Sequence, residues 1–108
     1  MSFPRKRGST KMTDKSYYLY ILCNKRNGTL YTGITSDLVR RIWQHKNGAI
    51  EGFTKRYGLK LLVHFEQYTD VKEAILREKR IKKWNRQWKI HLIEKDNPNW
   101  EDLYQKLT

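Results

Sequence analysis

The pattern of apolar and polar positions along this chain predicts a small protein with three strands and several helices. Short runs rich in Tyr, Leu, Ile and Val, bounded by Gly, Asn and Asp, are typical of strands. Longer stretches in which apolar residues recur every three or four positions are typical of helices. The predicted elements are strands over 17–23, 29–34 and 59–68, helices within 35–48, over 71–83 and over 85–95, and a short helix near the C-terminus.

This order, ββαβαα, predicts an α/β (α+β) fold in which helices flank a three-stranded mixed or antiparallel sheet. Residues 49–58 contain two glycines and no apolar period, so a loop is expected there. Residues 1–15 are basic and polar and are expected to form a flexible tail. We expect one folded domain over 16–95 and a C-terminal loop with a short helix over 96–108.

The first two strands form a predicted hairpin. Asn27 and Gly28 between them favour a two-residue type I′ turn, which needs a positive φ at both positions and would pair Asn24 with Tyr31. Because side chains alternate across a strand, one face then carries phenols and a stretch of bare backbone. That face consists of Tyr18, Tyr20, Tyr31 and Gly33. It is either an active-site wall, where Gly33 lets a nucleic-acid strand approach the backbone, or a set of ordinary strand tyrosines.

The helix that follows presents a candidate phosphate-binding group. Leu38 and Ile42 define its inward stripe, Arg41 lies at the edge of that stripe, and His45 follows one turn later on the same edge. Arg40 points away. A guanidinium offers a fixed fork of donors that suits a phosphate, particularly beside an imidazole. The alternative is an ordinary surface arginine beside a half-buried histidine.

Glu78 stands out on the helix over 71–83 because it falls within the apolar face, between Ala74 and Ile81. A carboxylate in that position is costly unless it is paired with a positive charge or a metal ion. The sequence leaves two interpretations open. Glu78 either forms a buried ion pair, with Arg41 as one candidate partner, or it is a metal ligand.

The chain carries a formal net charge of +12 over 108 residues, which indicates a polyanionic partner. Nucleic acid is the first candidate, and an anionic membrane surface is the second. Trp84 and Trp88 lie within the basic stretch 77–89 and either stack on bases or belong to the core. The candidate nucleic-acid-binding cations of this stretch are Arg77, Lys79, Arg80, Lys82 and Lys83.

Several classes of protein are excluded or disfavoured. The single cysteine, Cys23, rules out an intramolecular disulfide and a cysteine-cluster metal site, and its apolar surroundings predict a buried side chain. No stretch has the length of a membrane span, and the N-terminus lacks the apolar segment of a signal peptide. We therefore expect a cytoplasmic protein with no membrane partner. Zinc-type spacing, a Ser-His-Asp pattern and a glycine-rich phosphate loop are all missing from the sequence.

The remaining candidates, one carboxylate, one arginine, tyrosines and a histidine, suit hydrolysis of a phosphodiester with a single divalent cation. In their order and separation they resemble the GIY-YIG nuclease superfamily. The resemblance is closest to its small stand-alone putative endonucleases, the UPF0213-like or UvrC N-terminal-like proteins, and it covers roughly 16–95. It rests on "YLY" (18–20), "YTG" (31–33), "DLVRRIWQH" (37–45) and "EAILREKRIKKW" (73–84).

The resemblance implies one-metal hydrolysis of a DNA strand, in repair, recombination or processing, although RNA is not excluded as the substrate. It implies that Tyr31 is the general base, with Tyr20 and His45 in support. By the same resemblance Arg41 would hold the phosphate, and Glu78 would bind one divalent cation, Mg²⁺ or Mn²⁺. The competing interpretation is a nucleic-acid-binding module of the same fold with little or no catalysis. The sequence leaves the oligomeric state open.

The sequence also departs from the family pattern. Tyr18 stands in place of the first glycine of GIY, and Thr32 in place of the middle isoleucine of YIG. Ile34 occupies a position where repair-type members carry a lysine, and Ile90 one where some members carry an asparagine. None of these changes removes the core set, but the last two leave the substrate class open.

Overall fold

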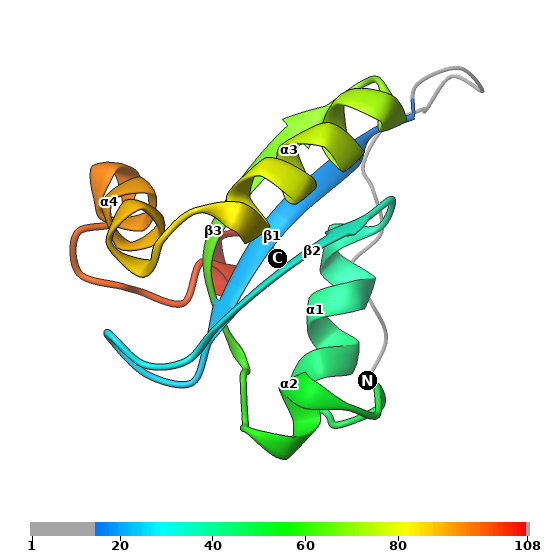
Figure 1. Ribbon diagram of the computed structural model, residues 1–108. Helices are drawn as coiled ribbons and strands as arrows, with labels where there is room; N and C mark the ends of the chain where they lie inside the picture. Colours follow the sequence, from blue (N-terminus) through cyan, green and yellow to red (C-terminus); the bar gives the residue numbers. More distant parts are fainter. Residues whose placement is uncertain (1–14, 108) are drawn as a thin grey trace.

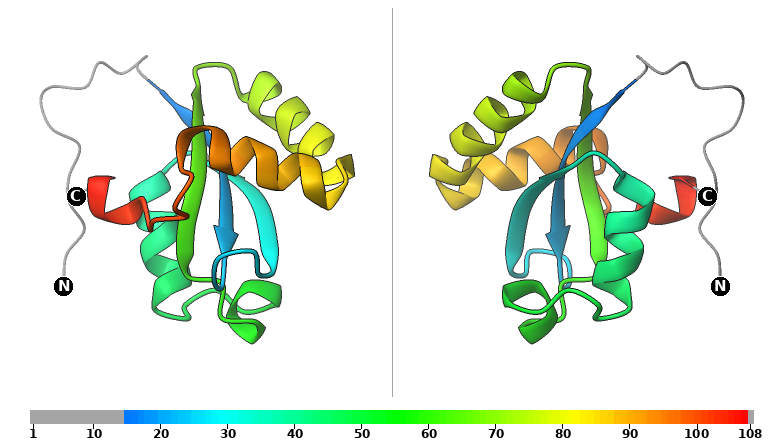
Figure 2. Two further views of the ribbon diagram at one scale, coloured as in Figure 1. Left: turned by 90° about the vertical axis from the view of Figure 1, so that its left-hand side faces the viewer. Right: turned by 90° about the vertical axis from the view of Figure 1, so that its right-hand side faces the viewer.

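The computed structural model describes residues 15–107 and contains an antiparallel sheet of three strands in the order β2-β1-β3. Except for Lys15, the basic tail expected over 1–15 lies outside the described residues. The sheet lies between two helical layers, with α3 and α4 over one face and α1 with α5 on the other (Figures 1 and 2). The elements are β1 (Tyr17–Cys23), β2 (Leu30–Thr35), α1 (Leu38–Lys46), α2 (Phe53–Arg56), β3 (Leu61–Tyr68), α3 (Val71–Lys83), α4 (Arg86–Asp96) and α5 (Tyr104–Leu107).

These elements confirm the predicted fold class and order, with one correction. The segment 49–58, expected to be a loop, contains the helix α2, whose single turn is too short to produce a hydrophobic period. Three helices begin at capping residues: the side chains of Asp37, Asp70 and Asn85 each accept a hydrogen bond from a backbone N–H of the first turn. Within residues 15–107, no helix combines the length and apolar character that crossing a membrane requires.

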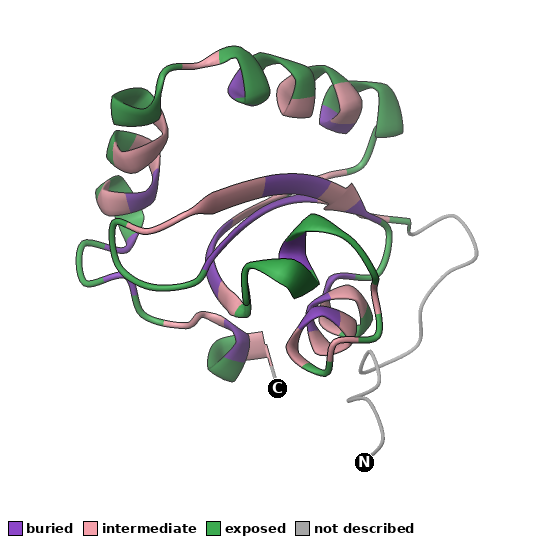
Figure 3. Ribbon diagram, turned by 60° about the horizontal axis from the view of Figure 1, so that its bottom comes forward, coloured by how far each residue is buried: buried purple, intermediate pink, exposed green. Residues whose placement is uncertain are grey.

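Alternating residues of β1 supply two separate cores. Leu19, Ile21 and Cys23 face the α3–α4 layer and pack with Ile81 and Ile93. As expected, Cys23 is buried, and that burial raises the pKa of its thiol to about 11. The opposite side chains of β1 face the other layer and are joined there by Leu38, Ile42, Leu62 and Tyr104. Figure 3 shows the buried stretches gathered on the strands and on the inner sides of the helices.

The hairpin register differs from the predicted one by two residues. Tyr31 pairs with Leu22, not with Asn24, because the strands are joined by a loop over 24–29 and not by a two-residue turn. The Asn24 side chain accepts a hydrogen bond from the Thr29 N–H at 2.9 Å and so closes this longer loop. A shift of two residues preserves the alternation of side chains, so the predicted face of the hairpin still forms.

The pairing of β1 with β3 contains a one-residue irregularity. Ile21 pairs with His64 whereas Leu22 pairs with Leu62, so Val63 is an extra residue on β3. From His64 to Tyr68, the even-numbered side chains of β3 therefore lie on the same face of the sheet as Ile21. Leu62, before the bulge, lies on the opposite face with Leu22.

The C-terminal segment covers the outer edge of β3. The Leu103 N–H donates to the Leu62 carbonyl at 2.7 Å, and the Leu62 N–H donates to the Asp102 carboxylate at 3.1 Å. Asp102 also forms an ion pair with Lys46 of α1. The two hydrogen bonds occupy both backbone groups of Leu62, which lies on an edge strand and would otherwise be open to another chain at this position.

Candidate active site

A hydrogen-bonded chain of three side chains lies at the centre of the predicted site. The Tyr20 hydroxyl on β1 is 3.1 Å from His45 Nε2 on α1, and His45 Nδ1 is 3.0 Å from Thr54 Oγ1 on α2. All three side chains are buried. A neutral imidazole can accept from Tyr20 at Nε2 and donate from Nδ1 to Thr54, which holds both ring nitrogens in fixed roles.

Tyr31 completes an aromatic cluster with these groups. Its ring centroid lies 6.3 Å from that of Tyr20 and 6.1 Å from that of His45. Gly33 lies directly opposite Tyr20 on β2, and a Cβ there would come within 2.7 Å of the Tyr20 hydroxyl. The glycine therefore makes room for a phenol of the protein itself, which is a different reason from the close approach of a substrate strand that the sequence suggested.

Two further predicted site residues, Arg41 and Glu78, lie close enough to Tyr20 to influence its pKa. Burial and the neighbouring Tyr31 raise the pKa of Tyr20 to about 12, and the charge of Glu78 adds to this rise. Arg41 opposes it through its charge and a hydrogen bond. Tyr20 is consequently a neutral phenol at physiological pH, and residues of β1, β2, α1 and α3 converge around it.

His45 is held in its neutral form. Burial and, to a smaller extent, the positive charge of Arg41 lower its pKa from 6.5 to about 4. On α1, Arg40 is exposed and Arg41 is half-buried, as the helix-face argument predicted, whereas His45, which was expected at the edge of the inward stripe, is buried. A buried neutral imidazole next to a phenol can accept or pass a proton without first losing one.

Glu78 lies on α3 with a side chain that is 18% exposed. Its ion-pair partner is Lys82, one turn further along the helix, with Nζ 3.1 Å from the carboxylate, and not Arg41 as one interpretation proposed. Lys82 is 52% exposed, so the pair is open to solvent on one side. Among residues 15–107, no three acidic, histidine or cysteine side chains are grouped closely enough to hold a metal ion by themselves.

The basic residues predicted to bind nucleic acid fall into two groups. Lys79, Arg80, Lys82 and Lys83 are exposed on α3. Arg77 instead makes two hydrogen bonds to Glu66 of β3, at 2.9 and 3.0 Å, and lies over the ring of Trp84. Its guanidinium is therefore committed inside the protein, so we omit Arg77 from the proposed contact surface.

The two tryptophans of the basic stretch also differ. Trp84 is half-buried and packs against the α3–α4 core, whereas Trp88 is 58% exposed, contrary to its interpretation as a core residue. Their rings meet edge to face with centroids 5.9 Å apart. Helix α4 is a separate helix that begins at Arg86 after its N-cap Asn85, so Trp88 does not lie on the face of α3.

Two features of the polar interior were missed from sequence. Thr54 was missed because α2 was expected to be a loop. The second feature is a network on the opposite face of the sheet, where His64 and Tyr68 both hydrogen-bond to Glu66, at 2.8 and 2.6 Å, beside Arg77. An alternating strand with His and Glu two residues apart was the available signal.

In the network on this opposite face, protein groups compensate the negative charge of Glu66. Burial alone would raise the pKa of Glu66, but hydrogen bonds from His64, Arg77 and Tyr68 outweigh it and hold that pKa well below its usual range. The same contacts raise the pKa of Arg77. Glu66 is therefore a permanently ionised group with all of its charge compensated by protein.

The fold and the site together define a class. Tyrosines on β1 and β2, an arginine on α1 and a glutamate on α3 surround one point beside a three-stranded sheet. The family model described as the GIY-YIG catalytic domain matches residues 16–91. The chain belongs to the GIY-YIG family.

The relatives narrow this assignment to the UPF0213 proteins. A UPF0213 protein of Staphylococcus epidermidis is 38% identical over 81 residues, which cover 75% of this chain and 96% of the relative. One from Clostridium perfringens is 40% identical over 89 residues, or 82% of this chain and 94% of the relative. The solution NMR structure of the UPF0213 protein BH0048 from Bacillus halodurans matches with a TM-score of 0.52 and 31% identity, covering 81% of this chain and 92% of that one.

Proposed function

We propose that this protein is a metal-dependent endonuclease that hydrolyses phosphodiester bonds of DNA. The observation that carries the proposal is that Tyr31, Arg41, His45 and Glu78 lie around Tyr20, which they contact or whose pKa they influence. A role in DNA repair, recombination or processing is proposed with it. Membership of a nuclease family and the +12 charge support a nucleic-acid substrate.

Arg41 is the proposed phosphate-binding group. It is half-buried on α1 and lies close enough to Tyr20 and His45 to alter the pKa of both. A guanidinium in this setting can hold two phosphate oxygens and stabilise the extra negative charge that develops in the transition state. The exposed cations Lys79, Arg80 and Lys83 on α3 would then hold the neighbouring phosphates of the strand.

The phenols and the imidazole are the proposed proton-transfer groups. Tyr31 is half-buried at the open side of the cluster and is the proposed base toward the attacking water. Tyr20 and His45 support it through their hydrogen bond, which fixes the orientation of both rings. Because His45 is neutral at physiological pH, it is able to accept a proton.

Glu78 is the proposed ligand of one divalent cation, Mg²⁺ or Mn²⁺. A single carboxylate fits Mg²⁺, which commonly binds through one or two carboxylates and completes its shell with water and substrate phosphate. When bound, such an ion supplies Lewis-acid stabilisation of the leaving oxygen. The proposal requires that the cation replace Lys82 as the partner of Glu78.

The ion pair between Glu78 and Lys82 is also the observation that favours the alternative, a nucleic-acid-binding module without catalysis. In that case Glu78 is already neutralised by protein, and no cation is needed. The aromatic and basic residues would then form an inherited binding surface.

The test is cleavage of labelled duplex, single-stranded and branched DNA with Mg²⁺ or Mn²⁺. We expect the wild type to cut at least one of these substrates, and Glu78→Gln to bind DNA equally or slightly better but not to cut it, since a negative charge has been removed. Glu73→Gln, on the exposed side of the same helix, is the matched control and should cut normally. Tight binding without cleavage by all three proteins would favour the binding module.

A further inference from the structure

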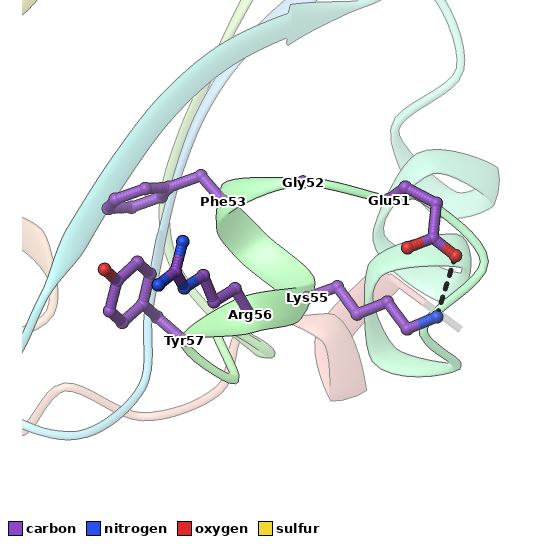
Figure 4. A pocket seen from close by; sticks show the side chains of 6 residues that line it. All are labelled: Glu51, Gly52, Phe53, Lys55, Arg56 and Tyr57. Carbon is purple, nitrogen blue, oxygen red and sulfur yellow. Dashed lines mark hydrogen bonds and ion pairs between the residues drawn. The ribbon is translucent and has the colours of Figure 1, made fainter.

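The short helix α2 and its flanks form an exposed aromatic surface that the site described above does not use. Phe53 is 47% exposed and Tyr57 is 46% exposed, and their ring centroids are 4.7 Å apart. The Arg56 guanidinium lies 5.6 Å from the centre of the Tyr57 ring. We call Phe53, Arg56 and Tyr57 the aromatic shelf. Figure 4 shows the three side chains together at one end of an open pocket.

The other end of this pocket is polar. Lys55 and Glu51 form an ion pair at 2.8 Å there, and both are exposed. The pocket encloses about 700 Å³ and is lined by residues of 51–57 alone. With Lys55 and Glu51 cancelling each other, Arg56 gives the pocket a net positive charge beside two uncovered rings.

The aromatic shelf is continuous with the candidate active site. The Phe53 ring stacks on Tyr31 with an interplanar angle of 28° and a centroid distance of 6.3 Å. The next residue, Thr54, points the other way and is hydrogen-bonded to His45. Two neighbouring residues of α2 therefore contact the candidate active site, Thr54 through His45 and Phe53 through Tyr31. These two contacts fix the position of the aromatic shelf relative to the candidate active-site residues.

We propose that the aromatic shelf stacks an unpaired base of the substrate strand next to the phosphate held by Arg41. With Tyr31, the shelf forms a series of three neighbouring rings, of which Phe53 and Tyr57 are exposed and are bordered by the Arg56 guanidinium. Exposed rings beside a cation resemble the platforms on which bases of single-stranded nucleic acid stack. Because the exposed rings of Phe53 and Tyr57 are adjacent, they form a patch and not a single scattered apolar side chain. This inference rests on the proposed function, and it adds a preference for strands that are locally single-stranded at the cut.

A base paired in a duplex is stacked on its own neighbours and cannot reach the shelf without leaving the helix. The shelf is therefore expected to matter for an exposed base and not for the phosphate backbone. That difference makes base stacking separable from general electrostatic binding, which every basic residue of the protein supports.

The experiment measures affinity on the Glu78→Gln protein, so that cleavage plays no part. The probes are a fluorescein-labelled oligothymidylate of twelve nucleotides, the same sugar–phosphate chain with abasic sites, and a duplex of equal length. We expect Phe53→Ala and Tyr57→Ala to weaken oligothymidylate binding by about tenfold each, because stacking on one aromatic ring contributes that order of affinity. Affinity for the abasic chain and the duplex should change by less than about twofold.

Two further variants show whether the ring itself is responsible. Phe53→Trp should restore oligothymidylate affinity, whereas Phe53→Leu, which keeps apolar bulk but has no π-face, should not. Equal losses on base-containing and abasic chains, or no loss at all, would overturn the proposal. Unchanged affinity with altered sedimentation of the Phe53→Ala protein would instead identify the shelf as a protein interface. If the wild type cuts DNA while Phe53 proves irrelevant to binding, only this inference fails and the proposed nuclease stands.

Discussion

The two faces of the sheet carry the same four residue types in opposite arrangements. On the α1 side lie Tyr20, His45 and Arg41, with Glu78 of α3 close enough to act on Tyr20. On the α3–α4 side lie Tyr68, His64, Arg77 and Glu66. In the second set three donors converge on one carboxylate, and the charges cancel. In the first set the carboxylate stands apart from the arginine and pairs with a solvent-exposed lysine.

The two clusters have the same residue types, so what separates the structural cluster from the candidate active site is whether the charged groups are fully hydrogen-bonded by other protein groups. Glu66 has no capacity left for a ligand, because all of its hydrogen-bonding groups are engaged by protein. Arg41 and Glu78 are oriented by the fold but keep exposed sides, so an anion and a cation can bind them. A charged side chain that keeps an exposed side is open to a ligand, whereas one whose hydrogen-bonding groups are all engaged by protein is not.

Loss of Arg41 should give the largest effect. Arg41→Ala is expected to lower the cleavage rate by about 100-fold or more, since removing one transition-state donor commonly costs that much. The free energy of unfolding of the Arg41→Ala protein should differ little from that of the wild type, because the Arg41 side chain is only half-buried. Arg40→Ala, on the exposed side of α1, is the control. Single-turnover cleavage at saturating protein measures the effect, and equal losses in both variants would show that the helix-face assignment is wrong.

Loss of the Glu66 carboxylate should lower the stability of the fold and leave the cleavage rate unchanged. Glu66→Gln is expected to lower the free energy of unfolding by about 3 kcal/mol at pH 7, because Arg77 is left without its counter-charge. The folded-state pKa of Glu66 lies below its unfolded value, so its contribution is complete above about pH 4.5 and is lost as the pH falls further. Urea unfolding at pH 7 and pH 3 should therefore show a smaller difference between wild type and variant at pH 3.

The same Glu66→Gln protein, assayed at a temperature at which it is folded, should cleave DNA at the wild-type rate. A large loss of activity in the folded variant would break the proposed separation of the two faces.

Thr54 should give the smallest effect. Thr54→Val keeps the shape of the side chain but removes the partner of His45 Nδ1, and the cleavage rate is expected to fall about fivefold, the equivalent of one hydrogen bond. The readout specific to this role is the tautomer of His45, followed by ¹⁵N chemical shifts of the imidazole. Thr54→Ser should restore both tautomer and rate. A normal tautomer in Thr54→Val would show that Thr54 does not position the ring.

Much of the fold was predictable because strong local signals determine it. Asp37, Asp70 and Asn85, residue types that favour helix N-termini, each cap one of the predicted helices. The hairpin register was not predictable, since it depends on the Asn24 side chain replacing backbone pairing in the loop. Helix α2 was missed because one turn leaves no period in the sequence.

Within the site, the helix-face argument predicted that Arg41 lies nearer the core than Arg40, because a regular helix places side chains at fixed angles. It did not predict that His45 is more buried than Arg41, since it placed both at the same edge of the inward stripe. The partner of Glu78 was missed although helix spacing offered it, since Lys82 lies four residues further along the same helix. The commitment of Arg77 to Glu66, eleven positions away across a turn, depends instead on tertiary packing.

The bulge at Val63 sets which face of the sheet the side chains of His64 and Glu66 occupy. If the bulge were absent and Val63 were paired with Ile21, the pairing of Leu22 with Leu62 would continue in step, so that His64 would lie opposite Tyr20 and Glu66 opposite Tyr18. A compensated carboxylate and a second imidazole would then crowd the candidate active site. The position of the bulge therefore matters as much as the composition of the strand: a conservative substitution in β3 alters packing locally, whereas a register in which Val63 is paired would bring together two sets of polar side chains that the fold keeps on opposite faces of the sheet.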